Sequence, residues 1–206
     1  MRLIVAQIFC LLMLIVPNLS HGQTAPVVVE LFSSQGCSSC PPADQYLVEL
    51  AQQRNIIALG WHVDYWDYIG WEDIFAHPAF TERQKAYARV MNERMIYTPQ
   101  FIVNGAESSG SGHRAEVAAL IQKYAQRAPG ADLSIRRMGA SYDITLQNAY
   151  YSGPYDVHLV SVTPMETVEI YRGENAGRRL DYANIVTEWH SLGRWDGLRP
   201  ARFETG

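Results

Sequence analysis

Two cysteines separated by two serines, Cys37-Ser38-Ser39-Cys40, are the residues of this chain whose types and spacing best fit a chemical role. A separation of three places both sulfurs on one face of a helical turn, close enough for a disulfide. A helix N-terminus adds free backbone N–H groups and a positive dipole, which stabilise a thiolate. Cysteines in such motifs have pKa values of about 3.5–7.5 instead of about 8.5. Because the thiolate attacks in thiol–disulfide exchange, we predict that Cys37 is the nucleophile and Cys40 the resolving cysteine.

The same C-x-x-C spacing also fits two other kinds of site, and the residues leave both open. In a copper-binding protein, the two thiolates would hold Cu(I), which prefers soft ligands, with His62 as the best third ligand. In a non-catalytic binding module, the disulfide would be structural and the C-terminal β region would hold a partner. Metal analysis of a His62→Ala variant tests the first alternative. The redox state of the two cysteines in cells tests the second.

A proline stands directly before a predicted strand, within residues 97–101 (Tyr-Thr-Pro-Gln-Phe). Proline removes a backbone donor from a strand, so its position needs a reason. We expect a cis Thr98–Pro99 peptide bond, with its loop packed beside the disulfide. The alternative is an ordinary trans proline at the start of the strand.

Glu30 is the one acid in the otherwise apolar stretch 27–32. A charged carboxylate is costly inside such a strand unless it has a partner or a function. We predict that Glu30 lies under Cys40 and accepts the proton of the resolving thiol. The alternative is that its side chain reaches solvent at the end of the strand.

Other candidates lie in an aromatic segment that follows residue 60. His62, Asp64 and Asp67 could ligate a metal or form a catalytic pair, but we expect them to hold the segment together. Three tryptophans are spaced by five, which fits neither a helix nor a strand: Trp61, Trp66 and Trp71. We expect them to pack the segment rather than to line a peptide groove. Residues 172–178 contain two glycines without a following Gly-Lys-Ser/Thr, which indicates a hairpin loop and not a phosphate-binding loop.

The elements that must position these residues alternate along the first part of the chain. The patterns predict strands at 27–32, 56–63, 101–103 and 106–109, and helices at 37–53, 81–95 and 113–127. A capping box at residues 81–84 begins the second helix, and Asn104-Gly105 indicates a hairpin. After residue 130 only strands are predicted, at 133–137, 142–146, 157–162, 168–172 and 180–189. We therefore predict an α/β domain over residues 23–127 and a C-terminal antiparallel β region over 128–206.

The composition is that of an ordinary globular protein. A length of 206 residues suggests one domain or two small ones, and a hydrophobic share of 48% is enough for a core. A charged share of only 18% argues against a disordered chain. The net charge of −4 and the lack of any longer basic run do not support nucleic-acid binding.

The N-terminus has the pattern of a secretory signal peptide over residues 1–22. Arg2 precedes an apolar run at residues 3–16, and Ser20-His21-Gly22 supplies small residues at the cleavage site. The run is shorter than the roughly 18–20 residues that a spanning helix needs, so we expect no stable membrane anchor after cleavage. Cleavage would discard Cys10 and leave Cys37 and Cys40 as a pair in a periplasmic or secreted protein.

Taken with their motifs, the stretches 30–44, 62–67, 98–105 and 172–178 resemble the thioredoxin superfamily, especially periplasmic disulfide oxidoreductases. More closely, they are similar to a family of secreted bacterial thioredoxin-like proteins classed as a domain of unknown function. The resemblance implies a thioredoxin-like fold, a cis Pro99 beside the sulfurs, peptide docking along the backbone of Thr98, and a proton-transfer role for Glu30. This chain differs in a longer loop before Cys37 and an insertion at residues 64–95. Such chains usually continue past residue 197, so we expect a last strand of the β region to be missing.

The predicted function is that of an exported thiol–disulfide oxidoreductase acting on protein or small-molecule thiols and disulfides. The dithiol is itself the redox group, so we expect no organic cofactor and no metal. The two serines between the cysteines bring no charge near the sulfurs. Oxidase, reductase and isomerase roles are therefore not distinguished by the sequence.

Overall fold

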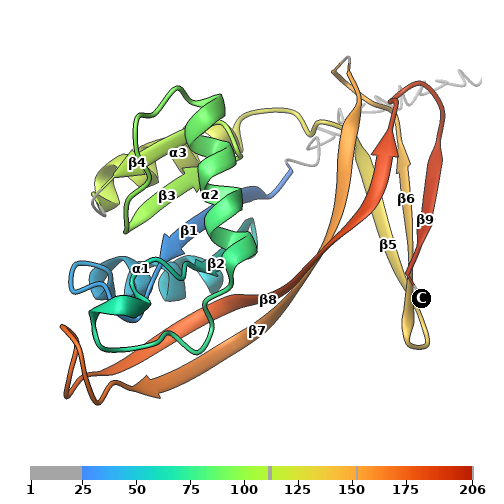
Figure 1. Cartoon of the computed structure of the whole chain (residues 1–206). Coiled ribbons are helices and arrows are strands. Elements are labelled where there is room, and N and C mark those ends of the chain that lie inside the picture. The colour runs from blue at the N-terminus through green and yellow to red at the C-terminus, as the bar shows by residue number, and fades with distance from the viewer. Residues whose placement is uncertain (1–24, 111–112, 152, 206) are drawn as a thin grey trace, which may run out of the picture.

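The structure, a computed structural model, describes residues 25–110, 113–151 and 153–205 (Figure 1). The predicted signal peptide and Cys10 lie outside these residues and stay predictions. The helices are α1 (Pro41–Ala51), the short 3-10 helix η1 (Asp67–Ile69), α2 (Pro78–Val90) and α3 (Arg114–Ala125). The strands are β1 (Val27–Ser33), β2 (Ile56–His62), β3 (Gln100–Val103), β4 (Glu107–Gly110), β5 (Asp132–Met138), β6 (Ser141–Gln147), β7 (Tyr155–Glu169), β8 (Arg179–Trp195) and β9 (Ala201–Glu204). No helix of this described part is long and apolar enough to cross a membrane.

A six-stranded mixed sheet, in the order β4-β3-β1-β2-β8-β7, forms the larger part of the fold (Figure 1). β2 is parallel to both β1 and β8, whereas β3, β4 and β7 run antiparallel to their neighbours. β1 lies inside the sheet because its β-branched and apolar side chains can be buried on both faces. The predicted element order β-α-β-α-β-β-α up to residue 127 is confirmed.

Helices cover both faces of this sheet. Val27, Val29 and Leu31 of β1 pack with side chains of α1 and α3 in one core. Phe32 lies on the opposite face and packs with Trp61 of β2 and with α2. Because side chains alternate along a strand, β1 separates these two core layers and places Glu30 on the side of Phe32.

The long β7–β8 hairpin joins the main sheet to a second sheet, which has the order β5-β6-β9 (Figure 1). Ile185 of β8 pairs with Gly60 of β2. Trp195 and Val157, at the far end of the hairpin, pack with Leu146 of β6. The C-terminal region is therefore antiparallel in its internal pairings, as predicted, and it also adds two strands to the main sheet.

The predicted start of the first helix is wrong. Residues 37–39 form turns, and α1 begins at Pro41 with Cys40 as its N-cap residue. Pro41 and Pro42 explain this start. Proline lacks an N–H, which costs least in the first turn of a helix because that N–H has no intrahelical partner there, and Pro41 and Pro42 occupy the first two positions. The cysteines therefore lie immediately before the helix instead of inside its first turn.

Two further boundaries differ from the prediction. The second helix begins at Pro78, and His77 accepts the N–H of Ala79, so the cap is His77 and not Thr81. The strands predicted at 157–162 and 168–172 form the single strand β7. Pro164 does not interrupt β7, because β7 is an edge strand and Pro164 has no partner in its register with β8.

The predicted Asn104-Gly105 hairpin is confirmed between β3 and β4. Both residues have positive φ values, 51° for Asn104 and 64° for Gly105, at the centre of a turn that the Ala106 N–H closes on the Val103 carbonyl at 3.1 Å. The Asn104 side chain also accepts the N–H of Val28 at 2.8 Å, and the Asn104 N–H donates to the Val28 carbonyl at 2.8 Å. The turn residue therefore also attaches the hairpin to β1.

Candidate active site

Cys37 and Cys40 form a disulfide with their Cα atoms 5.4 Å apart. The N–H of Cys40 donates to the Cys37 carbonyl at 3.2 Å, and the N–H of Asp44 donates to the Cys40 carbonyl at 3.0 Å. The Sγ atom of Cys37 lies 3.3 Å from the hydroxyl of Ser39. Ser38 and Ser39 are exposed, but both cysteines have an exposed fraction of 0%. The pair thus stands at the start of α1, beneath the surface.

The segment before the disulfide is held by contacts from the aromatic insertion. The N–H of Gln35 donates to Asp73 Oδ2 at 2.8 Å, and the indole N–H of Trp71 donates to Gln35 Oε1 at 2.8 Å. Gly36 lies against Trp66, where an added Cβ would stand 3.2 Å from the Trp66 Cβ and 3.3 Å from its carbonyl oxygen. A side chain at position 36 would therefore push this segment and the insertion apart.

A loop distant in sequence also contacts the cysteine segment. We call residues 170–178, which join β7 to β8, the hairpin tip. The Asn175 side-chain amide donates to the carbonyls of Gln35 at 2.8 Å and of Cys37 at 2.9 Å. A carboxylate oxygen of Glu174 accepts the N–H of Ser38 at 3.3 Å. The stretch predicted to be an ordinary hairpin loop is thus part of the wall around the disulfide.

A buried polar cluster lies beside α1. His62 Nδ1 and Asp73 Oδ2 are 2.7 Å apart, and both side chains are almost fully buried. The His62 ring packs against Phe75 and Tyr182. Burial opposes the charged form of His62, but the neighbouring charges of Asp73 and Asp44 outweigh it and raise the pKa of His62. The same Asp73 oxygen that pairs with His62 accepts the Gln35 N–H, so this cluster also positions the cysteine segment.

Asp44 is the second acid of the cluster and lies one helical turn after Cys40. It is buried, and its Oδ2 has no hydrogen-bond partner among the described residues. Burial raises the pKa of Asp44 to about 7, although the nearby His62 charge works in the other direction. A carboxyl with this pKa can hold or release a proton near neutral pH.

Replacing Asp44 by asparagine should flatten the dependence of stability on pH. The carboxyl has a pKa of about 3.9 in the unfolded chain and a raised pKa, about 7, in the folded protein. The folded state therefore binds more protons between these values, and stability falls as pH rises until the carboxylate is fully formed. His62, whose pKa is also raised, contributes in the same direction. Thermal melts from pH 5 to 8 should show the melting temperature of Asp44→Asn increasing relative to the wild type as pH rises. Parallel curves would contradict the buried-acid interpretation.

Glu30 is buried as predicted, and it has strong partners on the α2 side of the sheet. Arg83 donates to both of its carboxylate oxygens, at 2.7 and 2.9 Å, and the Tyr87 hydroxyl donates at 2.5 Å. The Arg83 guanidinium lies over the ring of Trp61 at 4.7 Å and over that of Trp189 at 4.9 Å. The alternative that Glu30 reaches solvent is excluded by its exposed fraction of 2%. The predicted position under Cys40 is wrong, because Glu30 faces α2 whereas α1 packs on the opposite face of the sheet. The predicted role of Glu30 as a proton acceptor is not tested by these contacts.

The Thr98–Pro99 peptide bond is cis, as predicted. Tyr97, the residue before Thr98, is held by Gln84 of α2, whose amide donates to the Tyr97 carbonyl at 2.7 Å. Gln84 also donates to the side chain of Gln100 at 2.8 Å. The Thr98 hydroxyl oxygen is buried, with no partner in the described part of the chain. The docking role predicted for Thr98 and Pro99 stays a prediction.

Trp61, in β2, and Trp66 pack in one cluster, as expected, whereas Trp71 is half-buried and lines an open pocket. Trp61 is fully buried and lies edge-on to Phe80 and Trp189. Asp64 accepts the hydroxyl of Thr81 at 2.5 Å, and the carboxylate of Asp67 accepts the N–H of Asp73. In the described residues, no group of three or more His, Cys, Asp or Glu side chains is arranged to hold a metal ion. The contacts of Asp64 and Asp67 therefore hold the insertion together, as expected.

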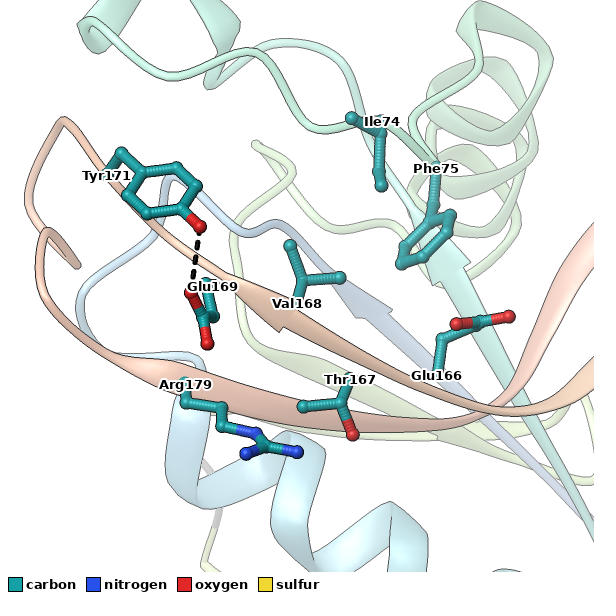
Figure 2. A pocket seen from close by; sticks show the side chains of 8 residues that line it. All are labelled: Ile74, Phe75, Glu166, Thr167, Val168, Glu169, Tyr171 and Arg179. Carbon is teal, nitrogen blue, oxygen red and sulfur yellow. Dashed lines mark hydrogen bonds between the residues drawn. The ribbon is translucent and has the colours of Figure 1, made fainter.

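An open pocket of about 610 Å³ lies along the β7–β8 hairpin (Figure 2). Figure 2 shows the hydroxyl of Tyr171 directed at Glu169, to which it donates at 2.7 Å. The lining residues are Ile74, Phe75, Glu166, Thr167, Val168, Glu169, Tyr171 and Arg179. Neither cysteine is among them, so this pocket does not open onto the disulfide.

The fold and the site together define a class of protein. The Cys37–Cys40 disulfide lies between the end of β1, which is parallel to β2, and the start of α1. A cis proline, Pro99, precedes β3. This is a thioredoxin-like α/β fold with a C-terminal antiparallel β region. The chain belongs to a protein family of unknown function, DUF1223, whose model matches residues 28–205. The predicted resemblance to a family of unknown function is confirmed.

Two solved structures are similar to this chain. Protein AGR_C_4864 from Agrobacterium tumefaciens is 32% identical, with a TM-score of 0.77, over 88% of this chain and 79% of that one. HBP35 of Porphyromonas gingivalis is 15% identical, with a TM-score of 0.61, over 88% of this chain and 64% of that one, and shows a likeness of fold alone. No curated protein matches the chain.

Three residues of the site were missed by the sequence reasoning: Asp44, Asp73 and Asn175. Asp44 had a local signal, because it lies four residues after Cys40 on the same helix. Asn175 lies in the stretch 172–178 that supported the family resemblance, but no local pattern assigns it a contact 138 residues away. Asp73 lies in the insertion, where only the folded chain brings it to Gln35.

Proposed function

We propose that this protein is an exported thiol–disulfide oxidoreductase and a member of the thioredoxin superfamily. The observation that carries the proposal is the disulfide between Cys37 and Cys40, placed directly before α1 with Cys40 as the N-cap residue. A cysteine thiolate next to the start of a helix is stabilised by the free N–H groups and the positive dipole there. Its substrates are protein or small-molecule thiols and disulfides in the periplasm or outside the cell.

In the proposed reaction the Cys37 thiolate attacks one sulfur of a substrate disulfide. A mixed disulfide forms, and one substrate sulfur leaves as a thiolate that takes up a proton. Cys40 then loses its proton and attacks Cys37 Sγ, which releases the second substrate thiolate and re-forms the Cys37–Cys40 disulfide. The substrate gains two electrons and two protons, and the protein dithiol loses them. The reverse sequence oxidises a substrate dithiol.

Two buried acids are the candidates for the proton of Cys40. Glu30 is the acid that the sequence suggests, but its carboxylate faces α2, on the other side of the sheet from α1, and is bonded to Arg83 and Tyr87. Asp44 is closer along the chain, shares a helical turn with Cys40, and has an oxygen without a hydrogen-bond partner among the described atoms. We assign a substrate strand to the backbone of Thr98, before the cis Pro99.

Trapping of mixed disulfides tests this proposal. A Cys40→Ala variant expressed in the native periplasm cannot resolve, so partners should accumulate on Cys37 as covalent adducts that a reductant releases. The Cys37→Ala variant is the matched control and should capture nothing. In parallel, the purified wild type should accelerate insulin reduction by a dithiol or oxidation of a dithiol peptide. No adduct on Cys37, together with no acceleration in either assay, would overturn the proposed function.

A non-catalytic binding module with a structural disulfide is the second candidate, and the full burial of both cysteines favours it. Reactive cysteines are usually partly exposed, whereas structural ones are buried and inert. In this case Cys37 and Cys40 stay oxidised in cells, no adduct forms, and reduction lowers the melting temperature. The trapping experiment and a thermal melt of the reduced protein therefore separate the two functions.

A further inference from the structure

The hairpin tip has one buried polar residue in an exposed loop. Residues 171–174 and 176–179 are exposed, but Asn175 has an exposed fraction of only 1%. The tip is held in shape by its own backbone hydrogen bonds, including Gly177 N–H to Ile170 carbonyl at 2.7 Å and Ile170 N–H to Arg178 carbonyl at 2.9 Å. The tip is therefore a preformed unit that presents one side chain inward.

The inward side chain contacts the segment that carries the cysteines. Asn175 donates one hydrogen bond to the carbonyl before Gly36 and a second to the carbonyl of Cys37 itself. Glu174 adds a contact to the next N–H, that of Ser38. One short loop thus contacts the backbone of Gln35, Cys37 and Ser38, while both cysteines have no exposed surface.

In thiol–disulfide exchange a thiolate must approach one of the two sulfurs, and the full burial of Cys37 and Cys40 blocks this approach. An attacking thiolate must reach a disulfide sulfur, and the rate depends on access as well as on the acidity of the thiols. With both cysteines fully buried, the closed form offers no such path. The tip also lies against the aromatic insertion, through Gly173 beside Trp71 and through the paired rings of Tyr171 and Trp71. All these contacts are at the outermost loop, so they can break while β7 and β8 stay paired along their length.

We propose that the hairpin tip is a removable cover of the disulfide, and that Asn175 is the positioning residue that keeps it closed. Exchange proceeds through an open state in which the two hydrogen bonds from Asn175 to the cysteine segment are broken. This inference rests on the proposed function for its biological meaning, but the opening itself is a property of the oxidised protein. Residues 170–178 thus control the access of other thiols to Cys37 and Cys40.

Reduction of the oxidised protein by dithiothreitol tests the cover directly. One dithiothreitol thiolate attacks the protein disulfide, and its second thiol then closes the reductant ring, so the protein gains two electrons and two protons. Asn175→Asp keeps the side-chain volume but replaces the donating amide by an oxygen that repels both carbonyls. Because two hydrogen bonds are lost, the rate of reduction should rise about tenfold or more. The rate is followed by quenching with an alkylating reagent and counting alkylated cysteines by mass.

Asn184→Asp is the matched control. Asn184 lies on β8 of the same hairpin, and its amide also donates to a backbone carbonyl, that of Ala58 at 3.0 Å. This variant should lose comparable stability but keep the wild-type rate of reduction. A wild-type rate in Asn175→Asp would overturn the cover, and so would an equal rise in both variants, which would indicate general destabilisation.

The outcome is distinguishable from that of the proposed function. Insulin turnover is measured on the same three proteins. Faster reduction of Asn175→Asp with no turnover in any of them supports the cover and opposes the oxidoreductase function. Turnover in the wild type without any change in the rate for Asn175→Asp supports the function and overturns the cover.

Discussion

Replacing Arg83 by methionine should lower the free energy of unfolding by about 3–5 kcal/mol, the range found when one partner of a buried ion pair is removed. The Glu30 side chain is 3% exposed and would lose two of its hydrogen bonds. Methionine also removes the cation–π contacts of the Arg83 guanidinium with the rings of Trp61 and Trp189. The loss therefore combines these contacts with the unpaired carboxylate. Urea unfolding followed by fluorescence measures it.

Lys85→Met on the same helix is the control for this prediction. Lys85 pairs with Glu82 at 2.7 Å, but both side chains are about half exposed or more, so the pair contributes at most about 1 kcal/mol. The double variant Arg83→Met with Glu30→Gln should recover part of the loss, because it removes the unpaired charge. Equal destabilisation by Arg83→Met and Lys85→Met would contradict the assignment of Glu30 and Arg83 as a buried pair.

Replacing Asp73 by alanine should have an effect of similar size, about 3–5 kcal/mol. Asp73 accepts the N–H groups of Gln35 and Phe75 and pairs with His62, so two buried donors and one half-buried donor lose their acceptor at once. For a protein of this size, each kcal/mol lowers the melting temperature by about 2–4 °C. Scanning calorimetry should therefore show a decrease of roughly 6–20 °C. His62 should also titrate at lower pH, because the charge that raises its pKa most strongly is gone.

Glu72→Gln is the matched control for Asp73, since Glu72 is the neighbouring acid and is exposed. It should change the melting temperature by less than about 2 °C, as most surface substitutions do. A second measurement follows the disulfide. Since Asp73 holds the N–H of Gln35, its loss should also speed reduction of the Cys37–Cys40 bond. A stable Asp73→Ala variant with an unchanged rate would show that the cluster does not position the cysteine segment.

Features that depend on neighbouring residues were predictable. The element order through residue 127, the Asn104-Gly105 turn and the cis bond before Pro99 are all confirmed. Each depends on local preferences: apolar periodicity, the positive φ values that asparagine and glycine tolerate, and the small cost of cis geometry before proline. Local preference also explains the main error, because proline favours the first position of a helix and α1 therefore begins at Pro41 instead of Cys37.

The sequence by itself determined that the chain carries a cysteine pair at the start of a helix after a buried strand, because spacing and periodicity are local properties. Only the tertiary structure decided what surrounds that pair. Arg83 reaches Glu30 across 53 positions, and Asn175 reaches Cys37 across 138. The first contact follows from the packing of α2 on the sheet and the second from the pairing of β8 with β2. Both depend on closing a long loop and not on any local pattern. The same two cysteines are therefore a motif in the sequence and a covered disulfide in the fold.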